Sequence, residues 1–217
     1  MILENFDLAS LILKAYNIPY YLLSAPAWVH DVRFDVTANI PSGATKEQFV
    51  VMQQNLLITR MALKVHYEKK EMAVYELIVA KGGIKLKEAS LTQKDSGDQS
   101  NAGSPKTDAD GFLVFPPGRT MYGLSGNRGS LQGAGETMEH FASTLAGQLQ
   151  SPVVDATGLT GKYDFSLKWV AGPPSDDAPG VNLESALPQQ LGLTLRKMRS
   201  PVKVLFVDHI EKAPTEN

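Results

Sequence analysis

The segment from Thr45 to Val79, TKEQFVVMQQNLLITRMALKVHYEKKEMAVYELIV, decides the predicted fold. Thr45 followed three residues later by Gln48 forms a capping box, and this predicts a helix that ends near Ala62. Large apolar residues recur at helical spacing and predict its buried face: Phe49, Met52 and Leu56. The segment therefore begins as an amphipathic helix.

The second part of the same segment has the alternation of β-strands. We predict one strand over residues 63–67 and a second over residues 74–79, because side chains two apart lie on one face of a strand. Glu68-Lys69-Lys70-Glu71 lies between them and is predicted to be a charged hairpin tip. The whole segment is thus interpreted as a helix followed by a β-hairpin.

Similar helix-then-hairpin patterns occur around Phe141 and Leu187, and an abbreviated copy spans Leu8 to Leu23. The abbreviated copy begins with a helix from about Phe6 to Tyr16 that Asn5 would cap. The last copy would contain a turn at Arg199-Ser200-Pro201, and Pro188 would make the first turn of its helix irregular. The sequence therefore predicts an α+β fold of repeated βαββ-like units, with mainly antiparallel sheets and helices packed on one face.

A polar segment separates the copies. From Lys87 to Gly111 the chain is rich in Ser, Gly, Asp and Lys and nearly lacks large apolar residues. We therefore predict a first half over residues 1–86, a polar linker over 87–111 and a second half over 112–217.

Composition excludes several classes of function. The 21 basic and 23 acidic residues give a net charge of -2, and no basic cluster would attract the phosphates of nucleic acid. Cys is absent, so disulfides, zinc–thiolate sites and Cys nucleophiles are excluded. No apolar run is long enough for a membrane span and no signal peptide is visible, so the sequence predicts a soluble chain.

Residues suited to catalysis or metal binding are few. None of the four histidines has the spacing of a zinc helix, and His66 and His140 are predicted to be surface residues. His209 beside Asp208 is a candidate for an oriented general base. Asp108 and Asp110 resemble a fragment of a calcium loop, without the later ligands of an EF-hand. No residue is predicted to bind another cofactor.

The segment Val153–Phe165, VVDATGLTGKYDF, resembles a family of uncharacterised, soil-associated bacterial proteins, expanded in soil acidobacteria and defined by a domain of unknown function. The resemblance extends to Arg33-Phe34-Asp35-Val36 and to the segment Val207–Lys212. Members carry a signal peptide and a strand before the first helix, and neither is apparent in this sequence. The pattern is also similar to the short βαββ domains at the N-termini of secretins and TonB-dependent receptors. The resemblance implies a periplasmic or secreted protein.

Two functions are compatible with these observations. The first is an extracytoplasmic binding or interaction module for an unknown small molecule or protein, since no catalytic constellation is apparent. The second is a small-molecule hydrolase, an esterase or lactonase acting on acyl-homoserine lactones with the help of Ca²⁺ at Asp108 and Asp110. The sequence does not predict the oligomeric state.

Overall fold

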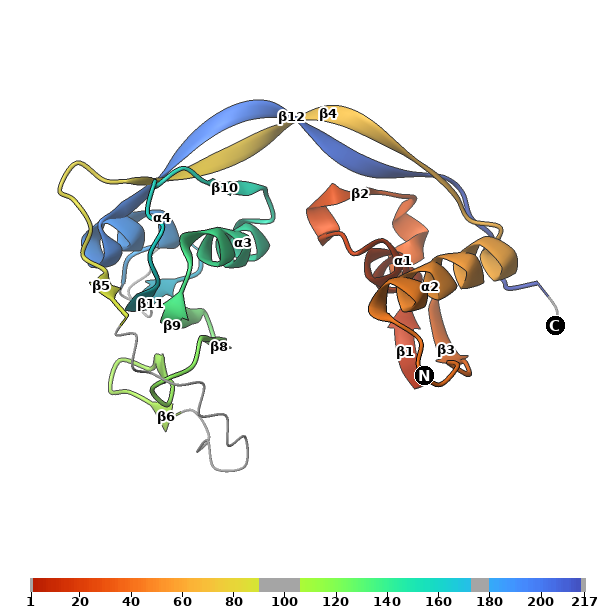
Figure 1. The fold of residues 1–217 in the computed structure, drawn as a ribbon, viewed down its shortest axis with the longest axis horizontal. Coiled ribbons are helices and arrows are strands. Elements are labelled where there is room, and N and C mark those ends of the chain that lie inside the picture. Colours follow the sequence, from red (N-terminus) through yellow and green to blue (C-terminus); the bar gives the residue numbers. More distant parts are fainter. Residues whose placement is uncertain (1, 90–105, 173–179, 216–217) are drawn as a thin grey trace. The chain divides into compact units, whose positions relative to one another are not determined.

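The computed structural model describes residues 2–89, 106–172 and 180–215. The chain forms two compact units (Figure 1). Unit 1 contains residues 1–72 and 199–217, and unit 2 contains residues 73–198. The division falls within two long strands, β4 (Lys64–Val79) and β12 (Leu193–His209), which are neighbours in one sheet. The polar segment 87–111, in its described parts, belongs to unit 2.

Unit 1 surrounds a core built mainly by one helix. That helix is α1 (Leu8–Tyr16). Besides α1 and its parts of β4 and β12, unit 1 contains β1 (Ile2–Asp7), η1 (Tyr20–Leu22), β2 (Leu23–Ser24), η2 (Ala27–His30), β3 (Arg33–Thr37) and α2 (Lys46–Met61). Leu8, Ile12 and Ala15 of α1 are fully buried, and Leu57 of α2 and Leu205 of β12 join them. β1 pairs with β3 in antiparallel fashion, and β2 pairs with β12 in parallel fashion.

Unit 2 packs helices on one face of an antiparallel sheet. Its elements are β5 (Lys87–Glu88), β6 (Lys106–Thr107), β7 (Leu113–Val114), β8 (Met121–Ser125), β9 (Arg128–Glu136), α3 (Met138–Leu149), β10 (Val153–Asp155), β11 (Tyr163–Val170), α4 (Leu183–Ala186) and a π-helical turn η4 (Leu187–Leu191). The sheet has the order β5-β11-β9-β8. Phe141 and Leu145 of α3 pack with Leu131 and Leu167 of the sheet in one buried cluster.

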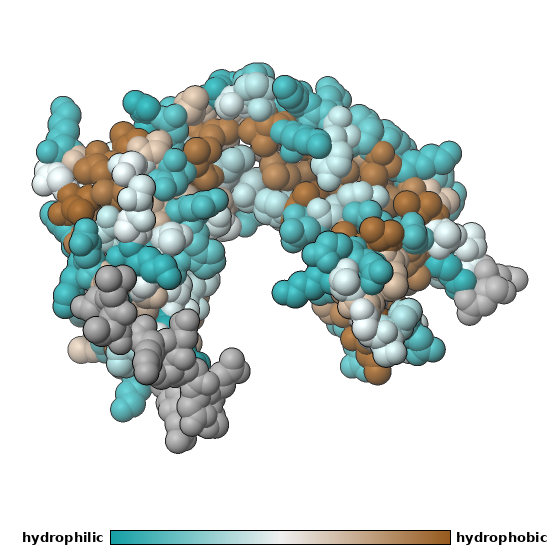
Figure 2. All heavy atoms as spheres, in the orientation of Figure 1, coloured by the Kyte–Doolittle hydropathy of each residue, from teal (hydrophilic) through white to brown (hydrophobic). Residues whose placement is uncertain are grey.

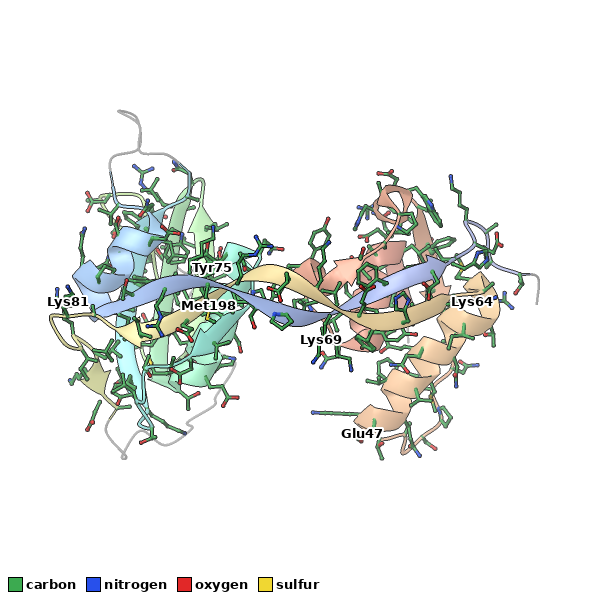
Figure 3. All side chains as sticks on the ribbon, turned by 90° about the horizontal axis from the view of Figure 1, so that it is seen from above. Glu47, Lys64, Lys69, Tyr75, Lys81 and Met198 are labelled. Atoms are coloured by element: carbon green, nitrogen blue, oxygen red, sulfur yellow. The ribbon has the colours of Figure 1, made fainter. Side chains whose placement is uncertain are left out.

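The predicted hairpins at residues 68–71 and 199–201 are wrong. β4 runs through 16 residues and β12 through 17 without a turn, and Figure 3 shows β4 unbroken past Lys69. Glu68-Lys69-Lys70-Glu71 contains no Gly or Asn, and none of these residues has the positive φ that a tight hairpin turn requires. The α+β class is confirmed, with mostly antiparallel pairing, but the repeated βαββ units are not.

The first helix begins later than predicted. Ile2–Asp7 forms β1, so the chain does have a strand ahead of the first helix. Asn5 lies in this strand with φ 57° at an irregularity in its pairing with β3. Asp7 caps α1 instead, and its carboxylate accepts hydrogen bonds from the backbone N–H and the hydroxyl of Ser10, both at 2.8 Å.

The capping box of α2 is confirmed, but its predicted buried face is rotated by about one residue. Gln53, Leu57 and Met61 are buried, whereas Met52 is exposed. This rotation lets the Gln54 amide donate to the carbonyl of Ala15 at the end of α1, at 3.0 Å. Tertiary contact with α1 thus overrides the most apolar stripe of the helix.

The helix is irregular at Pro188, but the irregularity follows the first turn and does not lie in it as predicted. The first turn, α4, is regular and capped by Asn182. After Ala186 the chain continues as the π-helical turn η4, in which Pro188 is the second residue and cannot donate the N–H that an α-helix would use. Gly192 closes this turn with φ 68°, and an added Cβ would lie 2.0 Å from the carbonyl oxygen of Gly83. Only glycine fits this close backbone approach.

Candidate functional site

Unit 2 contains a pocket of about 400 Å³ at one end of its main sheet. Trp169, Val170 and Leu183 form its base and are at most 8% exposed. Leu124 and Leu149 add apolar walls. The volume lies in the range of pockets that enclose small ligands or single side chains.

The base of this pocket is fixed at Trp169 by neighbouring residues. The indole lies over Gly129 of the adjacent strand, where an added Cβ would be 2.3 Å from its Cε2 atom. The Tyr122 ring stacks beside it at 6.0 Å between centroids. The Tyr122 hydroxyl also donates to Gln148 Oε1 at 2.8 Å, which ties β8 to α3. Packing on several sides leaves Trp169 one orientation.

Polar groups are found around the opening of the same pocket. Gln148, Asn182 and Glu184 contribute to its lining, and Glu184 is exposed on the first turn of α4. The pocket therefore combines an aromatic and aliphatic base with one carboxylate and two amides. Such a site suits a ligand that is apolar at one end and polar or cationic at the other.

Unit 1 has a larger hollow of about 740 Å³, and its lining is of another kind. It lies between the segment Pro41–Ala44 and the first turns of α2. Val51 and Met52 face it and are 52% and 36% exposed, and Figure 2 shows apolar residues among hydrophilic ones on the visible face of this unit. Since no residue that lines this hollow is buried, its walls are less constrained than those of the pocket in unit 2.

A second feature of unit 2 is a buried carboxylate that joins two other side chains. Glu136, at the end of β9, has a side chain only 8% exposed. Its Oε2 accepts a hydrogen bond from the Thr120 hydroxyl, and its Oε1 accepts one from Nδ1 of His140 in the first turn of α3. The His140 side chain is 67% exposed. A carboxylate at Nδ1 leaves Nε2 as the proton-accepting atom, as a general base requires.

Unit 1 carries a histidine–carboxylate pair on its strands. His66 Nδ1 of β4 lies 2.8 Å from Asp208 Oδ1 of β12, and both side chains are about half exposed. The hydrogen bond with Asp208 raises the pKa of His66, and Glu68, 3.8 Å from Nε2, adds to this effect. The imidazole also stacks on Phe206 at 5.4 Å.

The structure does not bring the predicted pair of Asp208 and His209 together. Neighbouring residues of a strand point to opposite faces, so Asp208 meets His66 while His209 Nε2 lies 3.0 Å from Glu211. The residue that could orient His209 is therefore the exposed Glu211 and not Asp208.

Asp108 stabilises a turn rather than facing other carboxylates. Its Oδ1 accepts the backbone N–H groups of Asp110 and Phe112 at 3.0 and 2.9 Å, and its Oδ2 accepts Lys168 Nζ at 2.7 Å. The Lys168 ammonium and the Phe112 N–H lower the pKa of Asp108. Asp110 is exposed. Within residues 2–89, 106–172 and 180–215, no group of three or more His, Asp or Glu side chains is placed to hold a metal ion.

The sequence did not single out the pocket or the role of Glu136. Leu124, Trp169 and Leu183 line the pocket together but come from distant parts of the chain. Glu136 immediately precedes the cap of α3 at Thr137, and His140 follows four residues later. That spacing across a helix start was the available signal for their contact.

The fold and these sites define the class of this protein. It is a mixed α+β protein that has, in one unit, a ligand-sized pocket and a histidine oriented by a carboxylate. No described helix is both long and apolar enough to cross a membrane. The chain belongs to the family described as Protein of unknown function (DUF3738), whose sequence model matches residues 9–210. No curated protein and no solved structure matches it.

Proposed function

We propose that this protein is a binding module acting outside the cytoplasm, with its ligand held in the unit 2 pocket beside Trp169. The observation that carries this proposal is the buried aromatic and aliphatic base of a pocket of about 400 Å³. A preformed apolar base contributes binding free energy without an ordering cost, and the nearby polar groups orient the ligand. The extracytoplasmic location rests on the family resemblance described above.

Ligand binding can be tested with Trp169 as the reporter. A Trp28→Phe background leaves Trp169 as the only tryptophan. We expect members of a library of neutral and cationic aromatic fragments to change its fluorescence and to raise the unfolding temperature, since they bind the folded state alone.

Two matched variants distinguish the two surface hollows. Ala171→Phe places a large ring at the unit 2 pocket, and Ala44→Phe does the same at the unit 1 hollow. Binding should weaken at least about tenfold in Ala171→Phe and stay unchanged in Ala44→Phe. The reverse pattern would place the binding site in unit 1. If no fragment changes the Trp169 fluorescence or raises the unfolding temperature, the proposal is overturned.

A second candidate function is hydrolysis of a small ester or lactone, such as an acyl-homoserine lactone. His140 supports it, because the buried Glu136 holds the ring with Nε2 available. His140 would take a proton from water as the water oxygen bonds to the acyl carbon. It would return that proton to the leaving alkoxide as the acyl–oxygen bond breaks, which gives a hydroxy acid from a lactone. Asp108 would have to release Lys168 before it could bind Ca²⁺.

The pair in unit 1 supplies the control for this candidate. A screen of esters and acyl-homoserine lactones should show turnover that falls by about a hundredfold or more in His140→Ala and persists in His66→Ala. Equal turnover in both variants would remove His140 from consideration, and a chelator tests the contribution of Ca²⁺ separately.

A further inference from the structure

Among the strands that the structure describes, β8 lies at the edge of the unit 2 sheet and pairs with β9 alone. The two strands are joined by Gly126 and Asn127, and Gly126 has the positive φ of 60° typical of a type II′ turn. In such a hairpin the residues beside the turn, Ser125 and Arg128, form a hydrogen-bonded pair, and the pairing then alternates along the strands. The N–H and C=O groups of Tyr122 and Leu124 consequently point away from β9.

No described strand pairs with these outward backbone groups. Within the described part of the chain, neither Tyr122 nor Leu124 makes a backbone hydrogen bond outside the hairpin. Tyr122 and Leu124 are 39% and 52% exposed. An edge of this kind can accept a further strand, because unpaired N–H and C=O groups form the template for one.

The two edges of this sheet differ in how they are protected. The opposite edge, β5, is two residues long, and both of its residues, Lys87 and Glu88, are charged. β8 has five residues, Met-Tyr-Gly-Leu-Ser, without a charge or a proline. Short length, charge and proline are the usual means of preventing strand addition, and β8 has none of them.

The free edge also adjoins the pocket. Leu124 of β8 lines the pocket together with Trp169, and Tyr122 stacks on the same indole. Every second side chain of an added strand would lie on the face of the sheet that carries these residues. One such side chain would be next to the pocket, and Glu184 would be close to its opening.

We infer that β8 binds an extended peptide segment of a partner protein, which adds a strand to this edge and places an apolar side chain in the pocket. A Lys or Arg near that side chain would face Glu184. Backbone hydrogen bonds would supply affinity and the pocket would supply specificity. This inference rests on the proposed binding function and names its ligand as a peptide.

Charge favours a partner over a second copy of this chain. Residues 121–127, which form β8 and its turn, contain no basic side chain. A copy that paired through its own β8 would therefore place no cation from that strand near Glu184. A basic and apolar peptide satisfies both the pocket and the carboxylate.

The test uses the full chain and a phage-displayed library of random nonapeptides. Selected peptides should contain an apolar residue near a Lys or Arg, and their affinities are then measured by fluorescence anisotropy. Leu124→Pro removes an outward N–H while leaving the bonds to β9 intact, and Leu124→Val keeps that N–H. We expect Leu124→Pro to weaken binding by about tenfold or more, and Leu124→Val by no more than about threefold.

Glu184→Lys should reverse the preference of the library from basic to acidic residues. Equal affinities for Leu124→Pro and Leu124→Val would overturn the inference, provided that circular dichroism shows both variants folded. Fragments that bind beside Trp169 when no peptide is selected would refute strand addition and leave the proposed function standing. A dimer in sedimentation that Leu124→Pro dissociates would assign the edge to a second copy instead.

Discussion

Both units carry a histidine–carboxylate pair and a surface hollow, His66–Asp208 in unit 1 and His140–Glu136 in unit 2, and the two units differ in what lies beneath them. In unit 1 the His66–Asp208 pair is half exposed and the hollow is lined by exposed residues of α2. In unit 2 the Glu136 carboxylate is buried and the pocket rests on core residues. Burial fixes orientation, and fixed orientation is what binding and catalysis need. The comparison therefore directs attention to unit 2.

The largest expected effect concerns the base of the pocket. Trp169→Ala should lower the free energy of unfolding by about 3–5 kcal/mol, because it removes a buried aromatic side chain and leaves a cavity. Val51→Ala, at the 52% exposed wall of the unit 1 hollow, should change it by less than about 0.5 kcal/mol. Urea unfolding of both variants makes the measurement. Similar losses in the free energy of unfolding for the two variants would show that core residues support both hollows equally.

A substitution at Gly129, next to Trp169, tests how tightly the base of the pocket is held. Gly129→Ala should cost about 1–3 kcal/mol and weaken fragment binding, because the new Cβ would displace the indole. Gly147→Ala on α3 meets no atom within 4 Å and should stabilise the protein by about 0.5–1 kcal/mol. The two variants are compared by thermal unfolding and by Trp169 fluorescence. If the Trp169 fluorescence is unchanged in Gly129→Ala, the neighbouring residues do not hold the indole in one orientation.

The two carboxylates should respond differently to neutralisation. Glu136→Gln should cost about 1–3 kcal/mol, since the donors of Thr120 and His140 lose a buried charged acceptor. Asp208→Asn, in the exposed pair, should shift the unfolding temperature by no more than about 2 °C. Calorimetry of the two variants measures both effects. If Asp208→Asn lowers the unfolding temperature more than Glu136→Gln does, the pair in unit 1 contributes more to stability than the pair in unit 2.

The smallest effect is a dependence on pH in unit 1. The pKa of His66 is raised in the folded state, so its contact with Asp208 stabilises below the unfolded-state value near 6.5. This contribution is lost as the pH rises through the raised folded-state pKa. His66→Gln should therefore lower the unfolding temperature by about 1–2 °C at pH 5.5 and leave it unchanged at pH 9. A difference at pH 9 as large as that at pH 5.5 would show that the contact is not ionic.

Local signals in the sequence predicted individual elements well. The capping box at Thr45 and Gln48 and the helix expected around Phe141 are both confirmed. Each depends on residues within a few positions of one another, so the pattern contains the whole cause.

Longer-range features were not predictable in the same way. The charged run at residues 68–71 suggested a turn, but exposed charges are equally compatible with the middle of a solvent-facing strand. The rotation of α2 depends on Gln54 reaching Ala15, which is 39 residues away. The pocket depends on residues from β8, α3, β11 and α4, and nothing in the sequence indicates that these elements converge.

The discontinuity of unit 1 has a consequence for biosynthesis. Residues 73–198 of unit 2 are contiguous, whereas unit 1 needs Leu205 and Ile210 to complete its core. During translation all of unit 2 emerges before residues 199–217 of unit 1 are synthesised. Unit 2 can therefore complete its fold on the ribosome before the core of unit 1 can be completed, which would reverse the usual order from the N-terminus. The exposed apolar surface of residues 1–72 in that interval would be a natural substrate for a chaperone.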